Sequence, residues 1–270
     1  MERKKINQYY ASEIEKDRLE LEFFKLEGIR TKDIITRFLS KDKMNIIDIG
    51  GGAGYYAFWL QEKGHSVSLI DLSQKNIELA NKHSLNTGIQ LSFCEAGDAT
   101  NLNFEDKQFD LALLFGPLYH LIDKEERLKA LSEAKRVLKP GSILLTAYIS
   151  RYTSLFDGFK RDLIIDDQFE KLLIDDLKTG IHLNETESLD YFTTAYFHTP
   201  PEIKDEIIES GLKFEKLIAV ESFGWIINDF KIKSEDKNYM KKFRNIINMV
   251  ESNEDMIAMS PHIMAIARKD

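Results

Sequence analysis

The stretch Ile46-Ile47-Asp48-Ile49-Gly50-Gly51-Gly52-Ala53-Gly54 constrains the fold more than any other part of the chain. Its three isoleucines predict a short strand buried on both faces, because β-branched side chains suit such a strand. The four glycines allow a sharp turn and a close approach of a ligand to the main chain. Residues 56–64 follow with apolar side chains at helical spacing and a final glycine. The stretch therefore predicts a strand, a tight loop and a helix whose first N–H groups face a ligand.

Two nucleotide-type cofactors are compatible with this loop. Residues 52–57 fit the dinucleotide pattern G-x-G-x-x-G/A, and residues 48–54 fit the acidic pattern of S-adenosylmethionine-dependent methyltransferases. Asp48 favours the second cofactor, because a carboxylate this close to the loop repels a pyrophosphate and attracts an ammonium or sulfonium group. A glycine-rich turn without a ligand is the remaining alternative.

Composition and charge narrow the class of protein. The 270 residues are 43% hydrophobic and 30% charged, which is enough for a substantial core under a charged surface. The net charge of -8, without a long basic run, argues against general affinity for nucleic acid or for anionic membranes. We therefore expect a small molecule as the partner.

The single cysteine and the N-terminal sequence indicate in which cellular compartment the protein is expected. Cys94 lies in an alternating stretch typical of a strand, where we expect it to be buried and inert. The first residues lack the apolar core of a signal peptide, and no run approaches the roughly 18 apolar residues that span a bilayer. We expect a cytoplasmic protein.

Acidic residues recur where successive predicted strands end. Strands are expected at about 65–71, 90–95, 109–115 and 142–149, and the run 109–115 is the most apolar and the best candidate for the centre of the sheet. Asp71 ends the second strand, and Asp98 follows the third. Ligands of open α/β sheets bind at the carboxyl ends of the strands, so Asp48, Asp71 and Asp98 are predicted to lie around one ligand.

The chain resembles the class I S-adenosylmethionine-dependent methyltransferases, in particular the bacterial small-molecule group. The segments that carry the resemblance are residues 48–54, Asp71, 97–99, 109–115, Gly116-Pro117-Leu118-Tyr119-His120-Leu121 and 138–141. The resemblance implies an α/β, Rossmann-like sheet of seven strands with the last strand antiparallel and helices on both faces. It also implies that Asp48, Gly50, Gly52 and Gly54 line the methionyl part, that Asp71 holds the ribose, and that Asp98 and Ala99 meet the adenine. We also place Tyr10, Leu72 and Phe115 among the cofactor contacts. Gly51 departs from the family, where a larger residue is usual, and we expect it to add loop flexibility.

Four segments are expected on this basis. Residues 1–30 are predicted to form an N-terminal helical lid, with an ordinary packing helix as the alternative and Gly28 as its end or bend. Residues 31–150 form the cofactor-binding core. Residues 151–198 form a helical cap after the fifth strand, with a dimer surface as the alternative. Residues 199–270 complete the sheet around a helical excursion at about 222–260, in which Ser234 is the expected N-cap.

Alignment of the acceptor with the methyl group is expected to supply most of the rate acceleration. His120 is the leading candidate for a base, because it follows the fourth strand and titrates near neutrality in its ordinary state. Tyr119 lies beside it, and Tyr9, Tyr196 and His198 are the candidate substrate contacts. A purely structural role for His120 is the alternative. Metal binding is not expected, because the sequence has no His-x-x-x-His pattern or cysteine cluster.

The sequence therefore predicts an enzyme that transfers a methyl group from S-adenosylmethionine to N or O of a small molecule, as a monomer or homodimer. Two alternatives stay open at this point. One is an NAD-dependent oxidoreductase, and the other is a non-catalytic module that binds S-adenosylmethionine.

Overall fold

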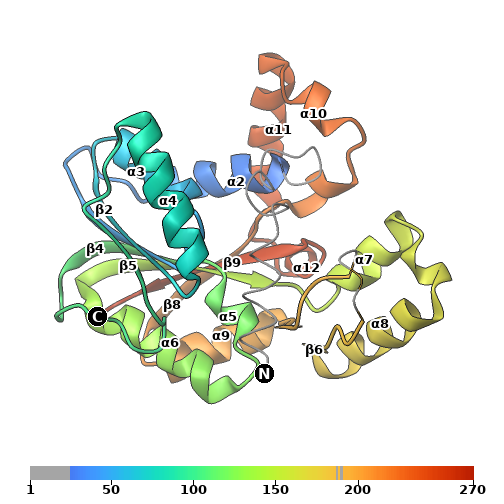
Figure 1. Cartoon of the computed structure of the whole chain (residues 1–270). Coiled ribbons are helices and arrows are strands. Elements are labelled where there is room, and N and C mark those ends of the chain that lie inside the picture. The colour runs from blue at the N-terminus through green and yellow to red at the C-terminus, as the bar shows by residue number, and fades with distance from the viewer. Residues whose placement is uncertain (1–24, 187, 189–190) are drawn as a thin grey trace.

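The computed structural model describes residues 25–186, 188 and 191–270, and its centre is a mixed sheet of seven strands (Figure 1). The strands are β1 Asn45–Ile49, β2 Ser66–Asp71, β3 Phe93–Ala96, β4 Phe109–Leu114, β5 Leu138–Ile149, β8 Lys213–Ala219 and β9 His262–Arg268. Their order in the sheet is β3-β2-β1-β4-β5-β9-β8. The pairs among β1 to β5 are parallel, whereas β9 runs antiparallel to both of its neighbours. The predicted Rossmann-like sheet with an antiparallel last strand is confirmed.

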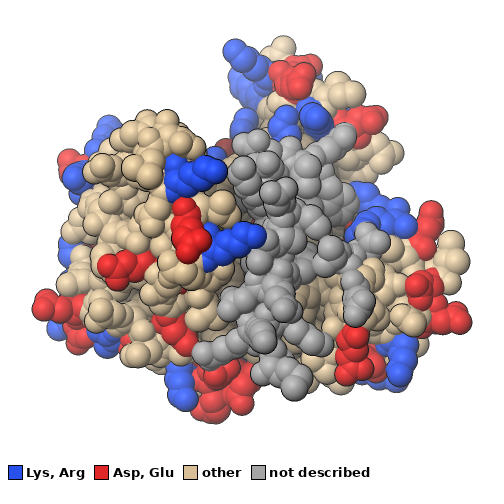
Figure 2. Space-filling view, in the orientation of Figure 1, with Lys and Arg blue, Asp and Glu red and all other residues tan. Residues whose placement is uncertain are grey.

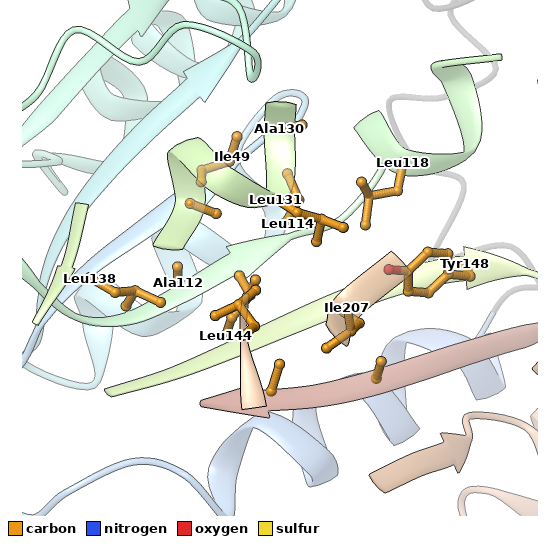
Figure 3. Packing of buried hydrophobic residues seen from close by; sticks show 14 of the residues in the cluster. Ile49, Ala112, Leu114, Leu118, Ala130, Leu131, Leu138, Leu144, Tyr148 and Ile207 are labelled. Carbon is orange, nitrogen blue, oxygen red and sulfur yellow. The ribbon is translucent and has the colours of Figure 1, made fainter. Parts of the chain in front are cut away.

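The middle of the sheet is the most deeply buried part of the fold. β4 is the central strand, and its residues 111–114 have no exposed surface. Alternate side chains of β1, β4 and β5 point to opposite faces, which is why these strands read as continuous apolar runs. Figure 3 shows one of the two resulting layers, in which side chains such as Ala112, Leu114 and Leu144 pack with Leu131 and Ile207.

Helices cover both faces of the sheet. α2 Lys25–Thr36, α3 Tyr55–Glu62 and α4 Gln74–Thr87 pack on one face. The other face is covered by α5 Pro117–His120, α6 Lys124–Val137, α9 Pro200–Glu209 and α12 Glu254–Ile257. The carboxyl edge of the parallel strands is left for the loops that follow them.

β5 begins earlier than its predicted start at Ser142. Phe109 of β4 pairs with Leu138, but Leu111 pairs with Ile143, so the pairing shifts between these two positions. This irregularity in β5 takes up the Lys139-Pro140-Gly141 segment, and such irregularities are where a sheet tolerates proline. The segment therefore belongs to β5, which follows directly after α6.

The segment after β5 forms a helical lobe at one side of the sheet (Figure 1). It contains α7 Thr153–Lys160, the 3-10 turn η3 Leu163–Ile165, α8 Asp167–Thr179, and a two-stranded sheet of β6 Ile181–His182 and β7 Ala195–Tyr196. Ser150 bridges to His198, so the chain enters and leaves this lobe at neighbouring points. Only two residues of the aromatic stretch 191–198 form a strand, and they pair with β6 rather than with the central sheet.

A second excursion separates β8 from β9. It contains η4 Ser222–Ile226, α10 Phe230–Lys233 and α11 Lys237–Val250, which project from the sheet (Figure 1). The prediction of Ser234 as the N-cap of this helix is wrong. Asp236 caps α11, because its carboxylate accepts hydrogen bonds from the backbone N–H groups of Asn238 and Tyr239. Ser234 instead ends α10, and its hydroxyl donates to the carbonyl of Lys231.

The predicted lid at 1–30 lies outside the described residues up to residue 24. Gly28 neither ends nor bends the helix, because it is a buried residue inside α2. A small residue at that position fits a helix face that packs closely on its neighbours.

Surface charges are mixed on the face that Figure 2 shows. Lys, Arg, Asp and Glu side chains alternate with neutral residues over its described part. Among the described helices, none is both long enough and apolar enough to cross a bilayer.

Candidate functional site

The three candidate aspartates lie where neighbouring parallel strands end. Asp48 is the next-to-last residue of β1, Asp71 ends β2, and Asp98 follows β3. Because these strands are adjacent and parallel, their carboxyl ends form one edge of the sheet. The predicted convergence of the three carboxylates on one edge is therefore present in the fold.

The glycine loop links this edge to α3. Gly50, Gly52 and Gly54 have φ angles of 75°, 58° and 90°, which side-chain-bearing residues rarely adopt. A Cβ atom on Gly52 would have Asn76 as its nearest neighbour at 4.0 Å, so the main chain is open there. α3 begins at Tyr55, and no side chain caps its first turn.

Asp48 lies beneath the loop, not on its surface. It has no exposed surface, and neither carboxylate oxygen has a hydrogen-bond partner among the described residues. Burial, with a smaller contribution from Asp71, raises its pKa to about 7, and the nearby amide of Ala57 offsets part of this effect. A buried carboxylate without partners is costly, so a cationic group bound above the loop would stabilise it.

Gly51 has a steric role that the sequence did not indicate. A Cβ atom there would lie 2.5 Å from the Asp48 carboxylate and 2.6 Å from a methyl group of Leu69. The absence of a side chain at Gly51 therefore makes room for Asp48, and the expected added flexibility stays a prediction.

Asp71 holds the glycine loop in place. One carboxylate oxygen accepts a hydrogen bond from the Gly52 N–H at 2.8 Å, and the other accepts from Ser73 and Asn76 at 2.9 and 3.0 Å. Burial raises the pKa of Asp71, and these hydrogen bonds offset part of the rise. The side chain is 9% exposed and has lone pairs left for hydroxyl donors such as those of a ribose.

The candidate adenine contacts lie beside Asp71. Leu72 is 43% exposed, which is unusual for a leucine next to a buried strand and suits a flat apolar ligand. Asp98 and Ala99 are half-buried, and the Asp98 carboxylate accepts hydrogen bonds from the N–H and hydroxyl of Thr100. Phe115 is buried and packs edge-on against Tyr56 on the opposite side of the loop. The roles of these residues stay predictions.

Tyr119 and His120 lie on α5, directly after the central strand. Gly116 precedes α5 with a φ of 114°, and the glycine loop packs against this turn, because a Cβ atom on Gly50 would lie 2.4 Å from Pro117. The loop that would hold the methionyl group and the turn that carries His120 are thus in direct contact.

The His120 imidazole is held in a neutral state. Its Nδ1 lies 3.4 Å from the carbonyl oxygen of Thr194, which can only accept a hydrogen bond, so we assign the proton to Nδ1. Burial lowers its pKa to about 4, and the Thr194 carbonyl offsets part of this shift. A base with this pKa is weak near neutrality, which differs from the expected titration near pH 7.

Phe192 is a candidate site residue that the sequence analysis missed. Its ring stacks on His120 with a centroid distance of 5.9 Å and an angle of 23°, and it lies 6.4 Å from the ring of Tyr119. Phe192 was predicted only as part of an edge strand or cap. No local pattern distinguishes it from other aromatic residues of that stretch, so only the fold brings it to His120.

Among the candidate substrate contacts, His198 is enclosed in the core and Tyr196 is half-buried on β7, and their role at the substrate stays a prediction. His198 has no exposed surface and lies 3.5 Å from the Glu206 carboxylate, packed edge-on against Tyr148. The Tyr196 hydroxyl donates to Glu202, and the Arg127 guanidinium lies 4.1 Å above its ring. Both side chains serve a polar network between the core and α9. Tyr9 and Tyr10 lie outside the described residues.

One group among the described residues has the donors that a metal ion would need. Oxygen atoms of Glu27 and Glu221 and a nitrogen of His262 lie within 4.8 Å of one another. His262 Nδ1 is 2.6 Å from Glu221, whose other oxygen accepts a hydrogen bond from Ser260 at 2.8 Å. These hydrogen bonds explain the grouping without an ion. The sequence did not indicate it, because its members are far apart along the chain.

Cys94 is half-buried on β3, less enclosed than expected. Burial raises the pKa of its thiol, and Glu95 adds to the rise, so little of it is the reactive thiolate. Its expected inertness agrees with this environment.

The sheet order, the glycine loop and the acidic carboxyl edge together define a Rossmann-like protein that binds a nucleotide-type cofactor. Residues 46–141 match the protein family described as "Methyltransferase domain". The chain therefore carries a class I S-adenosylmethionine-dependent methyltransferase domain, and its cofactor is S-adenosylmethionine. The partnerless Asp48 carboxylate and the open main chain at Gly52 fit a cofactor that carries a sulfonium and an ammonium group.

Relatives agree on the class and differ in the acceptor. A phosphoethanolamine N-methyltransferase of Plasmodium falciparum is 24% identical over 80% of this chain and 84% of its own length. A ubiquinone biosynthesis O-methyltransferase of Caulobacter vibrioides is 30% identical over 40% of this chain and 42% of its own length. The match thus spans less than half of the ubiquinone enzyme, and relatives described as probable tRNA methyltransferases match over a similarly short segment. A crystal structure of an S-adenosylmethionine-dependent methyltransferase from Methanosarcina mazei has a TM-score of 0.58 at 22% identity, covering 87% of this chain and 96% of that one, which supports the fold.

Proposed function

We propose that this protein transfers a methyl group from S-adenosylmethionine to a nitrogen or oxygen atom of a small-molecule acceptor. The observation that carries the proposal is the contact between the glycine loop and the turn before α5. It sets the candidate cofactor loop directly beside Tyr119 and His120. An acceptor bound against these two rings lies next to the place where the cofactor loop ends.

The residues of the site have separable roles in this proposal. Asp71 and the glycine loop bind the cofactor, Asp48 adds negative charge beneath it, and Tyr119, His120 and Phe192 orient the acceptor. The cofactor, when bound, supplies a methyl group already activated by the positive sulfur. Orientation of the acceptor therefore carries most of the catalysis, and the neutral His120 acts by its shape and hydrogen bonding more than by its charge.

The charges near the site favour an acceptor without a strongly anionic group. Glu27 and Glu221 lie at the same edge of the sheet, after β8 and beside the start of β9. Arg127 and Arg151 contact carboxylates of Glu206 and Glu202 at 2.7 and 2.9 Å, so both are already paired. We therefore expect an amine or a neutral hydroxyl compound rather than the phosphate-bearing acceptor named for the Plasmodium relative.

The predicted roles of the four segments and the predicted cellular location are also part of this proposal. Residues 151–198 act as a cap over the acceptor, residues 1–30 act as a lid, and 31–150 with 199–270 form the core. The single half-buried cysteine fits a reducing compartment, so we propose a cytoplasmic location.

The test combines cofactor binding with an acceptor screen. Calorimetry with S-adenosylmethionine, S-adenosylhomocysteine and NADH is expected to show binding of the first two only. A methyl-transfer screen then covers amines, phenols, catechols, carboxylates and phosphoethanolamine. Binding of NADH would favour the oxidoreductase alternative, and S-adenosylmethionine binding without turnover on any acceptor would favour a non-catalytic module.

A matched pair of histidine variants tests the acceptor side. His120→Ala is expected to lower turnover about 10- to 100-fold, a typical range for loss of one positioned group. His83→Ala is the control, because His83 is exposed on α4. Equal turnover of both variants across pH 6 to 9 would remove His120 from the mechanism.

A further inference from the structure

A buried polar group in the cap has no part in the chemistry described so far. It consists of Ser154 on α7, Asp176 on α8 and His182 on β6, which are 6%, 0% and 1% exposed. The Ser154 hydroxyl donates to the Asp176 carboxylate at 2.6 Å, and the same oxygen lies 2.9 Å from His182 Nδ1. Three elements of the cap therefore meet at one carboxylate.

The second nitrogen of His182 reaches the main chain of a site residue. Nε2 lies 3.0 Å from the carbonyl oxygen of Phe192. His182 therefore has a hydrogen-bonding partner at each ring nitrogen, the Asp176 carboxylate at Nδ1 and the Phe192 carbonyl at Nε2. The ring also stacks on Phe197 at 4.9 Å, which fixes its plane.

The segment that His182 holds is the one that contacts His120. The Phe192 ring stacks on His120, and the Thr194 carbonyl lies beside His120 Nδ1. A short path of direct contacts thus runs from Asp176 through His182 and Phe192 to His120.

We propose that Asp176 and His182 are positioning residues for the acceptor half of the site, because they fix the main chain of Phe192 and so set how Phe192 and Thr194 meet His120. This inference rests on the proposed function, which places the acceptor at Tyr119 and His120. The pair lies in the cap, whereas the candidate cofactor contacts lie at the ends of β1 to β3. Its influence is therefore on the acceptor and not on the cofactor.

Two substitutions at His182 separate its two hydrogen bonds. In His182→Asn the amide nitrogen takes the place of Nδ1, so the bond to Asp176 is kept and the bond to Phe192 is lost. In His182→Gln the longer side chain reaches the place of Nε2, so the bond to Phe192 is kept. A cap that needs only a filled cavity would respond to both in the same way.

The first measurement needs no acceptor. The chain has six histidines, so the His120 imidazole can be assigned by NMR and titrated with pH in the full-length protein. In the wild type its pKa is expected near 4, because burial keeps the ring neutral. His182→Asn is expected to raise this value by about one unit, as release of Phe192 admits water, whereas His182→Gln changes it by less than about 0.3 units.

A second variant covers the case in which His182→Asn does not fold. Phe192→Leu keeps the carbonyl that His182 binds but removes the ring over His120, and it is expected to raise the His120 pKa as well. Affinity for S-adenosylmethionine is expected to change less than about threefold in every variant. With an acceptor in hand, His182→Asn is expected to lower kcat/KM for that acceptor about tenfold at an unchanged KM for S-adenosylmethionine.

Three results would overturn the inference. They are an unchanged His120 titration in both His182→Asn and Phe192→Leu, equal shifts in the Asn and Gln variants, or a loss of cofactor affinity that matches the loss of turnover. The first two outcomes are independent of the acceptor screen, because they need only the His120 titration. A failed screen with the expected NMR shifts would count against the proposed function alone.

Discussion

Asp48 is the residue from which we expect the strongest pH dependence of cofactor binding. It is fully buried and without a partner among the described residues, and its pKa is raised to about 7. We expect affinity for S-adenosylmethionine to rise with pH through this value, because the ionised carboxylate attracts the cationic cofactor. Asp48→Asn is expected to lose about tenfold in affinity at pH 8 and to lose the pH dependence, as measured by calorimetry.

The same side chain makes the free protein less stable at higher pH. Between the ordinary aspartate pKa of 3.8 and about 7 the folded state holds a proton that the unfolded state has released. Stability therefore falls as pH rises through this window, by a few kcal/mol at about 1.4 kcal/mol per pKa unit, and the loss is complete above it. Asp48→Asn is expected to flatten this slope in urea unfolding. Asp110→Asn is the control, because Asp110 is the second residue of the neighbouring strand β4 and is paired with Lys139. A similar flattening there would contradict the assignment.

Gly51 offers a steric test of the same arrangement. Gly51→Ala places a Cβ atom 2.5 Å from the Asp48 carboxylate, so we expect a loss of about 1 to 3 kcal/mol in the free energy of unfolding. Gly141→Ala meets no atom within 4 Å and tests backbone strain alone at its φ of 80°. Thermal unfolding compares the two variants. An alanine at 51 that costs no more than one at 141 would show that the loop moves freely.

The sequence predicted single site residues where a local pattern, such as an apolar run, points to them. Asp48, Asp71 and Asp98 were found because they follow apolar runs, and the fold places all of them at one edge. Phe192 and Thr194 were not found, because their importance comes from a partner more than seventy residues away in the sequence, as the contact from His120 to Thr194 shows. His198 was expected at the substrate, but nothing local in the sequence indicates that Glu206 binds it inside the core.

At the level of elements, one buried ion pair joins α6 to α9. Arg127 and Glu206 are 2% and 3% exposed, and the guanidinium also donates to the carbonyls of Leu121 and Ile122. Burial would raise the pKa of Glu206, but the nearby His198 and the hydrogen bonds from Arg127 outweigh it and lower the value to about 2. The pair therefore stabilises the fold above the ordinary glutamate pKa of 4.5, and this contribution is lost as pH falls from there toward 2.

Breaking this pair is expected to be costly. Arg127→Met leaves the Glu206 charge buried without its main partner, and we expect a loss of about 3 to 5 kcal/mol in urea unfolding at pH 7. The double variant Arg127→Met, Glu206→Leu is the matched control, because two apolar side chains need no partner. It is expected to recover most of the loss. A double variant as unstable as the single one would mean that packing, and not charge, is what α6 and α9 share.

The sequence predicted most of the helices and strands, but it predicted their first and last residues less well. Strands β2 and β4 begin and end within a residue of their predictions, because apolar runs bounded by polar residues define them. The start of α11 and the start of β5 were misplaced. Both depend on a choice among neighbouring residues of similar propensity, Ser234 against Asp236 in one case, and tertiary contacts make that choice.

At the scale of the whole molecule, the cap is an insertion whose two ends meet. Ser150 and His198 are bridged, and the Arg151 N–H donates to the His198 carbonyl at 2.8 Å. We expect that residues 153–193 can be replaced by about eight Gly and Ser residues without loss of the central sheet. The shortened protein is expected to bind S-adenosylmethionine within about threefold of the wild type and to lose methyl transfer. Loss of cofactor binding would show that the core cannot bind S-adenosylmethionine without the cap.

The order of strands and helices in the sequence predicted the overall architecture. It did not predict which contacts join the core to the segments that project from it. A repeated strand-loop-helix order leaves few topologies, since crossovers between parallel strands are right-handed. The contacts of α2 with α11, such as the ion pair of Asp33 with Arg244, join segments that no sequence pattern connects.

The place of β9 has a consequence for how the chain is made. β5 ends at Ile149, but the strand that pairs with its free edge begins only at His262, and β8 has β9 as its neighbour in the sheet. During synthesis the ribosome must therefore produce the cap and the second excursion while two apolar strands still lack a neighbour. Nascent chains of this kind are exposed to aggregation, and chaperone binding at that stage would protect the edge on which the finished enzyme depends.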